Sequence, residues 1–259
     1  MARQPVLTLA EELTLLALRD EKGTFQADLF EYTVAAALVS ELILRHRITV
    51  DQEKKKLVNL VSPEKVGDPL LDECLERMHS AKRRASLRDW VLRLARLKKL
   101  RHRVALQLCQ RGILKAEQDK VLLVFTRKIF PEIDRRPETA LVETLRQAIF
   151  TDTAAVAPRT TVLISLAHET GLLKRVFDRK LLQGRKTRIE QLIKGELTGK
   201  AAKVAIQAVQ AALFVVIMPK LTQHPCAFHK LVHVGPTLRN TGPADWGRRG
   251  TGGSSPSCA

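Results

Sequence analysis

Two basic residues, Lys98 and Arg101, have the types and spacing to bind an anion together. They lie in the stretch from Leu87 to Leu114, whose apolar residues recur at helical spacing. On one continuous helix, Arg101 falls within the apolar stripe and Lys98 lies one turn before it, so both heads could converge on one phosphate. The alternative is that the helix breaks near Lys98 and both charges are solvated.

No motif for catalysis accompanies these cations. The sequence has no nucleophile elbow, no glycine-rich phosphate loop and no HExxH zinc motif. Cys226, His229 and His233 have a metal-ligand spacing, but the second half of a zinc site is missing. His168 lies on an apolar helical segment and is predicted to be a core or cap histidine. We therefore expect a protein that binds a partner, not an enzyme, and neither a metal nor another cofactor.

Composition indicates what kind of partner this is. The 259 residues carry a formal net charge of +17, so we expect an anionic partner: nucleic acid, an anionic membrane surface or an acidic protein. Only 4% of the residues are aromatic, which predicts an aliphatic core. Four cysteines without framework spacing indicate a reducing compartment.

Neither a signal peptide nor a membrane span is expected. Glu11 and Glu12 interrupt the first apolar run, unlike the core of a signal peptide. The most apolar stretch, Ala211 to Met218, is far shorter than the ~20 residues that cross a bilayer. We read it as part of a buried helix.

The elements that would position the cations are mainly helices. Thr8 and Glu11 form a capping box, and Asp68-Pro69 supplies the N-cap and first residue of another helix. Two short hairpins each follow a helix, and there is no βαβ rhythm. The expected helices begin at Leu9, Phe25, Pro69, Leu87, Glu138, Thr160, Leu172, Thr187 and Lys200, and the expected hairpin strands are Ile48–Val50, Leu57–Val61, Ile113–Leu114 and Val121–Phe125.

These elements predict a mainly α fold. Residues 1–219 are expected to form a single compact helical domain with the two short β-hairpins. Residues 220–259 are rich in Gly, Pro, Ser, Thr and His without an apolar period, and we expect a disordered C-terminal tail there.

Several of these stretches, in this order, resemble the Golgi phosphoprotein 3 family. The resemblance runs from about Leu7 to Met218 and implies a compact helical domain that binds membranes peripherally. Eukaryotic members recognise the head group of phosphatidylinositol 4-phosphate. Because this chain enters its first helix almost at once, it looks more like a bacterial-type member. The matching motifs are LTLAEELTLLAL, SELILRHRITV, GDPLLDECL, Trp90-Val91, LQLCQRGIL, VLLVF and LISLAHETGLL.

The resemblance also implies a head-group site. The two basic residues of the family's pocket helix fall on Lys98 and Arg101, and Arg103 continues that basic set. Gln26 stands where the family has its pocket Trp, and Ala35 where it has a pocket Arg. The hairpin near 121–125 resembles the family's membrane-facing, self-association hairpin, which would allow a homo-oligomer; the alternative is an ordinary core hairpin.

The expected function is that of a cytoplasmic protein, peripherally associated with membranes, that binds anionic lipid head groups. A first alternative is a basic nucleic-acid-binding protein with winged-helix-like units, in which Lys54 to Lys56 form a wing. A second alternative is an adaptor without a lipid role that holds the acidic tails of other proteins.

Overall fold

The computed structural model describes residues 6–18, 30–51, 55–121, 125–197 and 203–207. All of them belong to one compact unit, Met1–Lys220. Within these ranges the chain is mainly helical with two antiparallel two-stranded sheets, which confirms the predicted fold class. The predicted tail, the Cys226, His229 and His233 pattern and the apolar stretch 211–218 lie outside the described residues.

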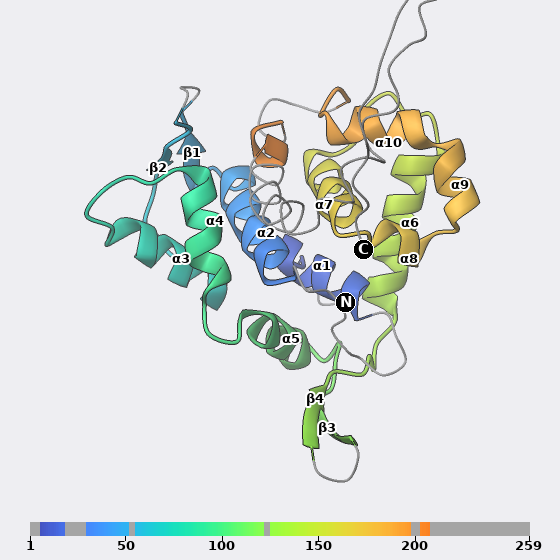
Figure 1. Cartoon of the computed structure of the whole chain (residues 1–259), viewed down its shortest axis with the longest axis horizontal. Helices are drawn as coiled ribbons and strands as arrows, with labels where there is room; N and C mark the ends of the chain where they lie inside the picture. Colours follow the sequence, from blue (N-terminus) through green and yellow to red (C-terminus); the bar gives the residue numbers. More distant parts are fainter. Residues whose placement is uncertain (1–5, 19–29, 52–54, 122–124, 198–202, 208–259) are drawn as a thin grey trace, which may run out of the picture. The chain divides into compact units, whose positions relative to one another are not determined.

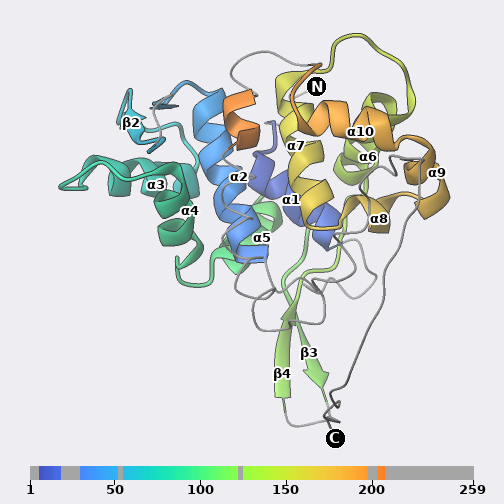
Figure 2. The same ribbon diagram turned by 45° about the horizontal axis from the view of Figure 1, so that its top comes forward.

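Helix α2 (Phe30–Leu44) is the centre of the fold (Figures 1 and 2). It is apolar on all sides, as a helix surrounded by others must be, and it contacts α1, α3, α4, α5 and α7. Ala35, Ala36 and Ala37 are completely buried, so neighbouring helices can approach its backbone closely. The alanine-rich middle of this segment therefore packs as its sequence predicts.

Both capping signals that the sequence predicts, at Thr8 and at Asp68, are confirmed. Helix α1 (Leu9–Ala17) begins at a capping box in which the Thr8 hydroxyl accepts from the Glu11 N–H and the Glu11 carboxylate accepts from the Thr8 N–H. Helix α3 (Pro69–His79) begins after Asp68, whose carboxylate accepts from two backbone N–H groups of the first turn.

The first hairpin is also confirmed. Strand β1 (Ile48–Val50) pairs antiparallel with β2 (Val58–Leu60), and Ile48 stands opposite Leu60. Ile48 and Val58 are buried, so this hairpin contributes to the core beside α2 and α3.

The stretch 87–114 is not one helix. Helix α4 (Leu87–Ala95) ends in tight turns, and α5 (Leu100–Gln110) begins after Lys99, which has a left-handed backbone (φ 56°). The continuous helix was therefore wrong, and the alternative of a break near Lys98 is what the structure shows. The break lets the chain leave the side of α2, on which α4 packs, and bring α5 against α1 as well.

The second hairpin exists but its bounds differ from the prediction. Strand β3 (Glu117–Val121) pairs with β4 (Phe125–Ile129), and Val121 stands opposite Phe125. The polar residues between the two predicted strands thus form most of β3, and the predicted strand Val121–Phe125 has only its two ends in strands, while residues 122–124 lie outside the described residues. A two-stranded ribbon that extends away from the helices needs no apolar face, so polar residues can form it (Figures 1 and 2).

The remaining helices follow α5 in the chain, and among them α7 (Pro158–Glu169) packs against α2. Helices α6 (Arg136–Phe150), α7 (Pro158–Glu169) and α10 (Lys186–Ile193) agree with the predicted elements. The predicted helix from Leu172 to Leu182 is instead two short ones, α8 (Leu173–Val176) and α9 (Arg179–Gly184), because Asp178 caps a new start. Residues 203–207 are helical, within the last predicted helix. His168 is exposed in the last turn of α7, so of its two predicted roles, a core or a cap histidine, the core role was wrong.

Candidate functional site

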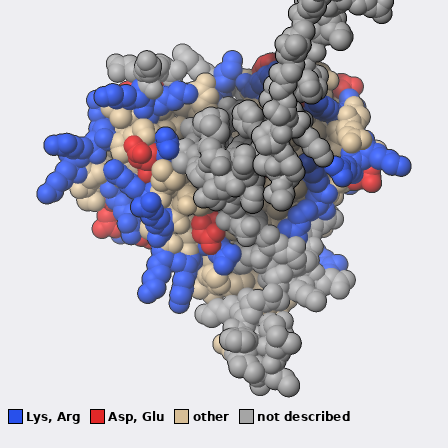
Figure 3. Space-filling model, viewed as in Figure 1, with Lys and Arg blue, Asp and Glu red and all other residues tan. Residues whose placement is uncertain are grey.

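Four cations, Arg96, Lys98, Lys99 and Arg101, gather where α4 passes into α5, and we call this set the basic corner. The chain break places them there, since Arg96 caps the C-terminus of α4 and Lys99 precedes the first residue of α5. Arg96, Lys98 and Lys99 are exposed, and none of them has a carboxylate within 4 Å in the described part of the chain. On the face in Figure 3, Lys and Arg gather over the area that α3, α4 and α5 occupy in Figure 1.

Arg101 is not the isolated guanidinium that the continuous helix predicted. Its Nε lies 3.2 Å from Oε1 of Glu31, on the first turn of α2. The two side chains are 35% and 32% exposed, so solvent and a dissolved anion can reach both. An ion pair this exposed contributes about 0–1 kcal/mol, which an incoming phosphate could offset.

Arg103 points to a different partner. Its Nη2 lies 2.5 Å from Oε2 of Glu73 on α3, and Glu73 also pairs with Arg77. Burial alone would raise the pKa of Glu73, but the hydrogen bonds from Arg103 and Arg77 outweigh it and lower that pKa. Arg103 therefore fastens α5 to α3, whereas Lys98 and Arg101 lie at the start of α5.

The start of α5 adds a favourable electrostatic feature. No side chain caps this N-terminus, and the first turn contains no acidic residue. The N-terminal end of a helix carries partial positive charge and attracts anions. The basic corner therefore combines side-chain cations with the positive end of a helix, which is an arrangement suited to a phosphate.

The two positions where this chain departs from the family pattern differ in what the structure says of them. Gln26 lies outside the described residues. Ala35 is completely buried in α2, so it offers no group to a ligand. An anion at the basic corner would therefore be bound without an arginine from this position of α2.

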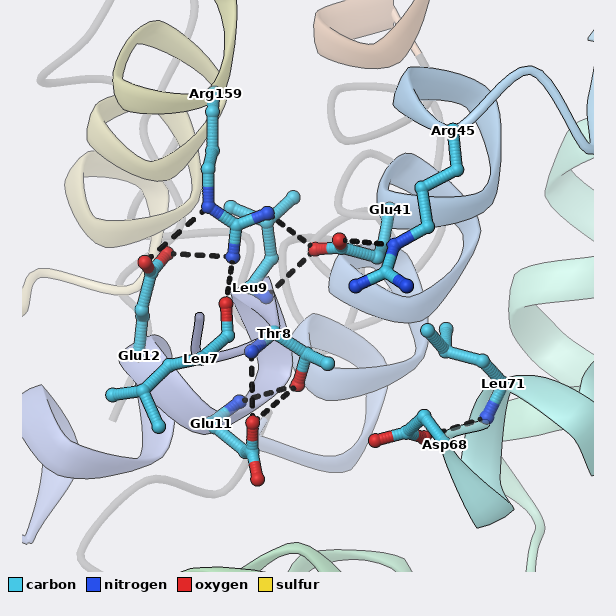
Figure 4. Close-up of polar contacts among 10 residues, drawn as sticks. All are labelled: Leu7, Thr8, Leu9, Glu11, Glu12, Glu41, Arg45, Asp68, Leu71 and Arg159. Carbon is cyan, nitrogen blue, oxygen red and sulfur yellow. Dashed lines mark hydrogen bonds and ion pairs between the residues drawn. The ribbon is translucent and has the colours of Figure 1, made fainter. Parts of the chain in front are cut away.

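A second cationic centre lies between α1, α2 and α7, and the sequence analysis did not predict it. Arg159, on the first turn of α7, donates from Nη1 to Oε2 of Glu41 at 2.7 Å and lies 3.2 Å from Oε2 of Glu12 (Figure 4). It also donates to the carbonyl oxygen of Leu7, and Arg45 donates to the other oxygen of Glu41 at 2.7 Å. This Arg159 network joins α1, α2 and α7.

The pKa values of the two carboxylates in the Arg159 network are shifted in opposite directions. Burial raises the pKa of Glu12 to about 7, despite the nearby Arg159 charge. Burial would also raise the pKa of Glu41, but Arg159, the Leu9 N–H and Arg45 outweigh it and hold that pKa below its ordinary value. Residue spacing could not predict this network, because 147 residues separate Glu12 from Arg159. The signal in the sequence was the presence of two acidic residues, Glu11 and Glu12, on the otherwise apolar helix α1.

The described residues hold no group of three His, Cys, Asp or Glu side chains that could bind a metal. Burial raises the pKa of the Cys74 thiol to about 12, so this cysteine is a packing residue. None of the helices in the described ranges is both long and apolar enough to cross a membrane.

Comparison with known proteins assigns this chain to a family. The model of the family described as Golgi phosphoprotein 3 (GPP34) matches residues 9–209. The vacuolar protein sorting-associated protein 74 of Eremothecium gossypii is 29% identical over 208 residues, which cover 67% of this chain and 62% of that protein. The chain thus spans less than two thirds of that relative. The match to the family model extends over most of the described helices, and the chain belongs to the Golgi phosphoprotein 3 family.

Proposed function

We propose that this protein is a peripheral membrane protein whose basic corner binds the phosphorylated head group of an anionic lipid, by resemblance phosphatidylinositol 4-phosphate. The observation that carries the proposal is the exposed set of Lys98, Lys99 and Arg96 beside Arg101, at a helix N-terminus that lacks acidic residues. Family membership supports the same ligand class. A bacterial-type origin and a cytoplasmic location stay predictions.

The energetics favour binding that depends on salt. Basic residues near an anionic bilayer contribute about 1 kcal/mol each, and screening reduces this contribution within a Debye length. Lys98 and Lys99 are free to contact lipid phosphate, and Arg101 can exchange Glu31 for it. Because Ala35 supplies no second guanidinium from α2, we expect weaker discrimination among phosphoinositides than a pocket with that arginine would give.

Vesicle flotation tests the proposal. The full chain is mixed with phosphatidylcholine vesicles that contain phosphatidylinositol 4-phosphate, phosphatidylserine or neither, at two salt concentrations. Lys98→Ala/Arg101→Ala should reduce retention on anionic vesicles by about tenfold or more, as two lost charged contacts require. Arg175→Ala/Lys180→Ala removes the same charge from exposed positions on α8 and in the first turn of α9, and should change retention by less than twofold. Equal losses in both variants would refute the site.

Nucleic-acid binding remains the alternative that the charge suggests, and one structural observation weighs against it. Of the two predicted helix–hairpin units, the first uses α2, which is buried along nearly its whole length and has no face for bases. Part of its predicted wing, Lys54 included, lies outside the described residues. Sequence-dependent retardation of DNA at physiological salt would favour this alternative, and capture of acidic protein tails that survives high salt would favour the adaptor.

A further inference from the structure

A separate cleft lies among the short helices at the end of the described chain. It has a volume of about 240 Å³ and lies between the C-terminal end of α7 and helices α8, α9 and α10. None of its residues belongs to the basic corner. The cleft is lined by His168, Leu173, Lys174, Arg179, Leu182, Gln183 and Lys186.

Three of these lining residues are cations whose charges are poorly balanced. Lys174 and Arg179 have no carboxylate within 4 Å in the part of the chain that the structure describes, and Lys186 reaches Glu190 only at 3.9 Å. A neighbouring arginine, Arg185, behaves differently: it pairs with Asp152 at 2.8 Å and donates to the Phe150 carbonyl oxygen at 2.5 Å. The cleft cations are therefore available to an outside anion.

The local fold explains why the nearest acid does not neutralise Arg179. Asp178 is the N-cap of α9, and its Oδ1 accepts from the backbone N–H groups of Lys180 at 2.8 Å and Leu181 at 3.2 Å. Asp178 thus starts the helix that positions Arg179, while its carboxylate serves backbone donors instead of the guanidinium.

The size and lining of the cleft indicate which ligands it could bind. Leu173 and Leu182 line the cleft and are buried, so an apolar surface lies among the exposed cations. Typical small-molecule sites measure about 300–1,000 Å³, so a cleft of about 240 Å³ suits a compact ligand. His168 and Gln183 add side-chain N–H donors at its edge.

We propose that this cleft is a second anion site and binds a phosphomonoester group through Lys174, Arg179 and Lys186. A phosphomonoester carries about two negative charges and three acceptor oxygens, which matches three cations together with the side-chain N–H groups of His168 and Gln183. The group can come from a soluble metabolite or from a lipid with a terminal phosphate, and the chemistry of recognition is the same.

Calorimetric titration of the full chain with glycerol 3-phosphate tests this site with a soluble phosphomonoester. Lys174→Gln/Arg179→Gln should weaken binding by about tenfold or more, because each charged hydrogen bond contributes roughly that factor. Arg175→Gln/Lys180→Gln is the matched control: it removes the same charge from neighbouring exposed residues that do not line the cleft, and should change the affinity by less than twofold. Lys98→Gln/Arg101→Gln should likewise retain glycerol 3-phosphate binding in the cleft, which separates this site from the basic corner.

Vesicles of phosphatidylcholine with phosphatidic acid distinguish the two sources. Loss of retention in Lys174→Gln/Arg179→Gln alone would assign the site to a lipid phosphate, whereas unchanged retention together with weaker glycerol 3-phosphate binding would assign it to a soluble one. The proposal is overturned if the cleft variant changes neither glycerol 3-phosphate binding nor retention on phosphatidic acid vesicles, or if the cleft variant and its matched control lose affinity equally.

Discussion

The Arg159 network and the basic corner place similar cations in opposite circumstances. The Arg159 side chain is 28% exposed, but its partners Glu12 and Glu41 are only 13% and 3% exposed, and it also donates to a backbone carbonyl oxygen, so its charge is used within the fold. Lys98 and Lys99 are exposed without a described carboxylate partner. A basic residue therefore indicates a ligand only when the fold leaves its charge unbalanced, and net charge alone does not distinguish the two cases.

Arg101 lies between these extremes. It has an internal carboxylate partner, as Arg159 does, but the pair with Glu31 is about one-third exposed. Its position predicts that it binds an external anion in competition with Glu31. We therefore expect a cation paired with buried carboxylates to contribute mainly to stability, and an exposed cation to contribute mainly to anion binding.

The largest effect is expected from removing the Arg159 guanidinium, whose carboxylate partners are buried. Arg159→Ala leaves Glu12 and Glu41 inside the protein without their shared cation, and breaking such a pair costs about 3–5 kcal/mol. The free energy of unfolding, measured with urea, should fall by that amount. The matched variant Arg96→Ala removes an exposed arginine and should change stability by less than about 0.5 kcal/mol; similar values for both would abolish the distinction.

A smaller effect concerns pH. The pKa of Glu12 is about 7 in the folded protein and near 4.5 in the unfolded chain, so the folded state binds more protons between these values. Stability should therefore decrease as pH rises from about 4.5 to 7, by up to about 3 kcal/mol from this group.

Glu12→Gln isolates this contribution. Unfolding curves at several pH values should show a shallower decrease for Glu12→Gln than for wild type, while Glu76→Gln, an exposed change on α3, should reproduce the wild-type slope. Identical slopes for wild type and Glu12→Gln would mean that Glu12 stays charged against Arg159 throughout.

The smallest effect is expected at the exposed pair. Glu31→Gln removes the carboxylate that pairs with Arg101, and since such an exposed pair contributes about 0–1 kcal/mol, retention on anionic vesicles should increase by about two- to fivefold. Glu76→Gln makes the same charge change elsewhere and controls for net charge. A decrease in Glu31→Gln would show that Glu31 positions Arg101 for the ligand instead of competing with it.

Local signals in the sequence predicted much of the fold. The Thr8 capping box, the Asp68-Pro69 start and the first hairpin depend on residues close together in the chain, and all three are confirmed. The division of 172–182 was also readable, because Asp178 is a typical N-cap before Arg179. The predicted bounds of the second hairpin were wrong because the apolar run Val121–Phe125 is typical of a strand, whereas the two strands form largely from the polar residues on either side of it.

The candidate site was less predictable. Nothing in the sequence marks Lys99 as the residue that turns left-handed and ends the helical period, so the geometry of Lys98 and Arg101 was inferred from a helix that is not continuous. Arg101 pairs with Glu31, 70 residues earlier, and such a pairing depends on how α5 packs against α2. The positions that the family resemblance singles out, Lys98, Arg101 and Arg103, stay predictions as ligand residues.

Nuclear magnetic resonance of the arginine side chains tests the central comparison most directly. The soluble head group of phosphatidylinositol 4-phosphate is titrated into the full chain, and the Nε resonances of Arg101 and Arg159 are followed together. We expect a saturable shift of the Arg101 resonance that disappears in Lys98→Ala, with no change at Arg159. An unchanged Arg101 resonance, or equal shifts at both arginines, would contradict a head-group site at the basic corner.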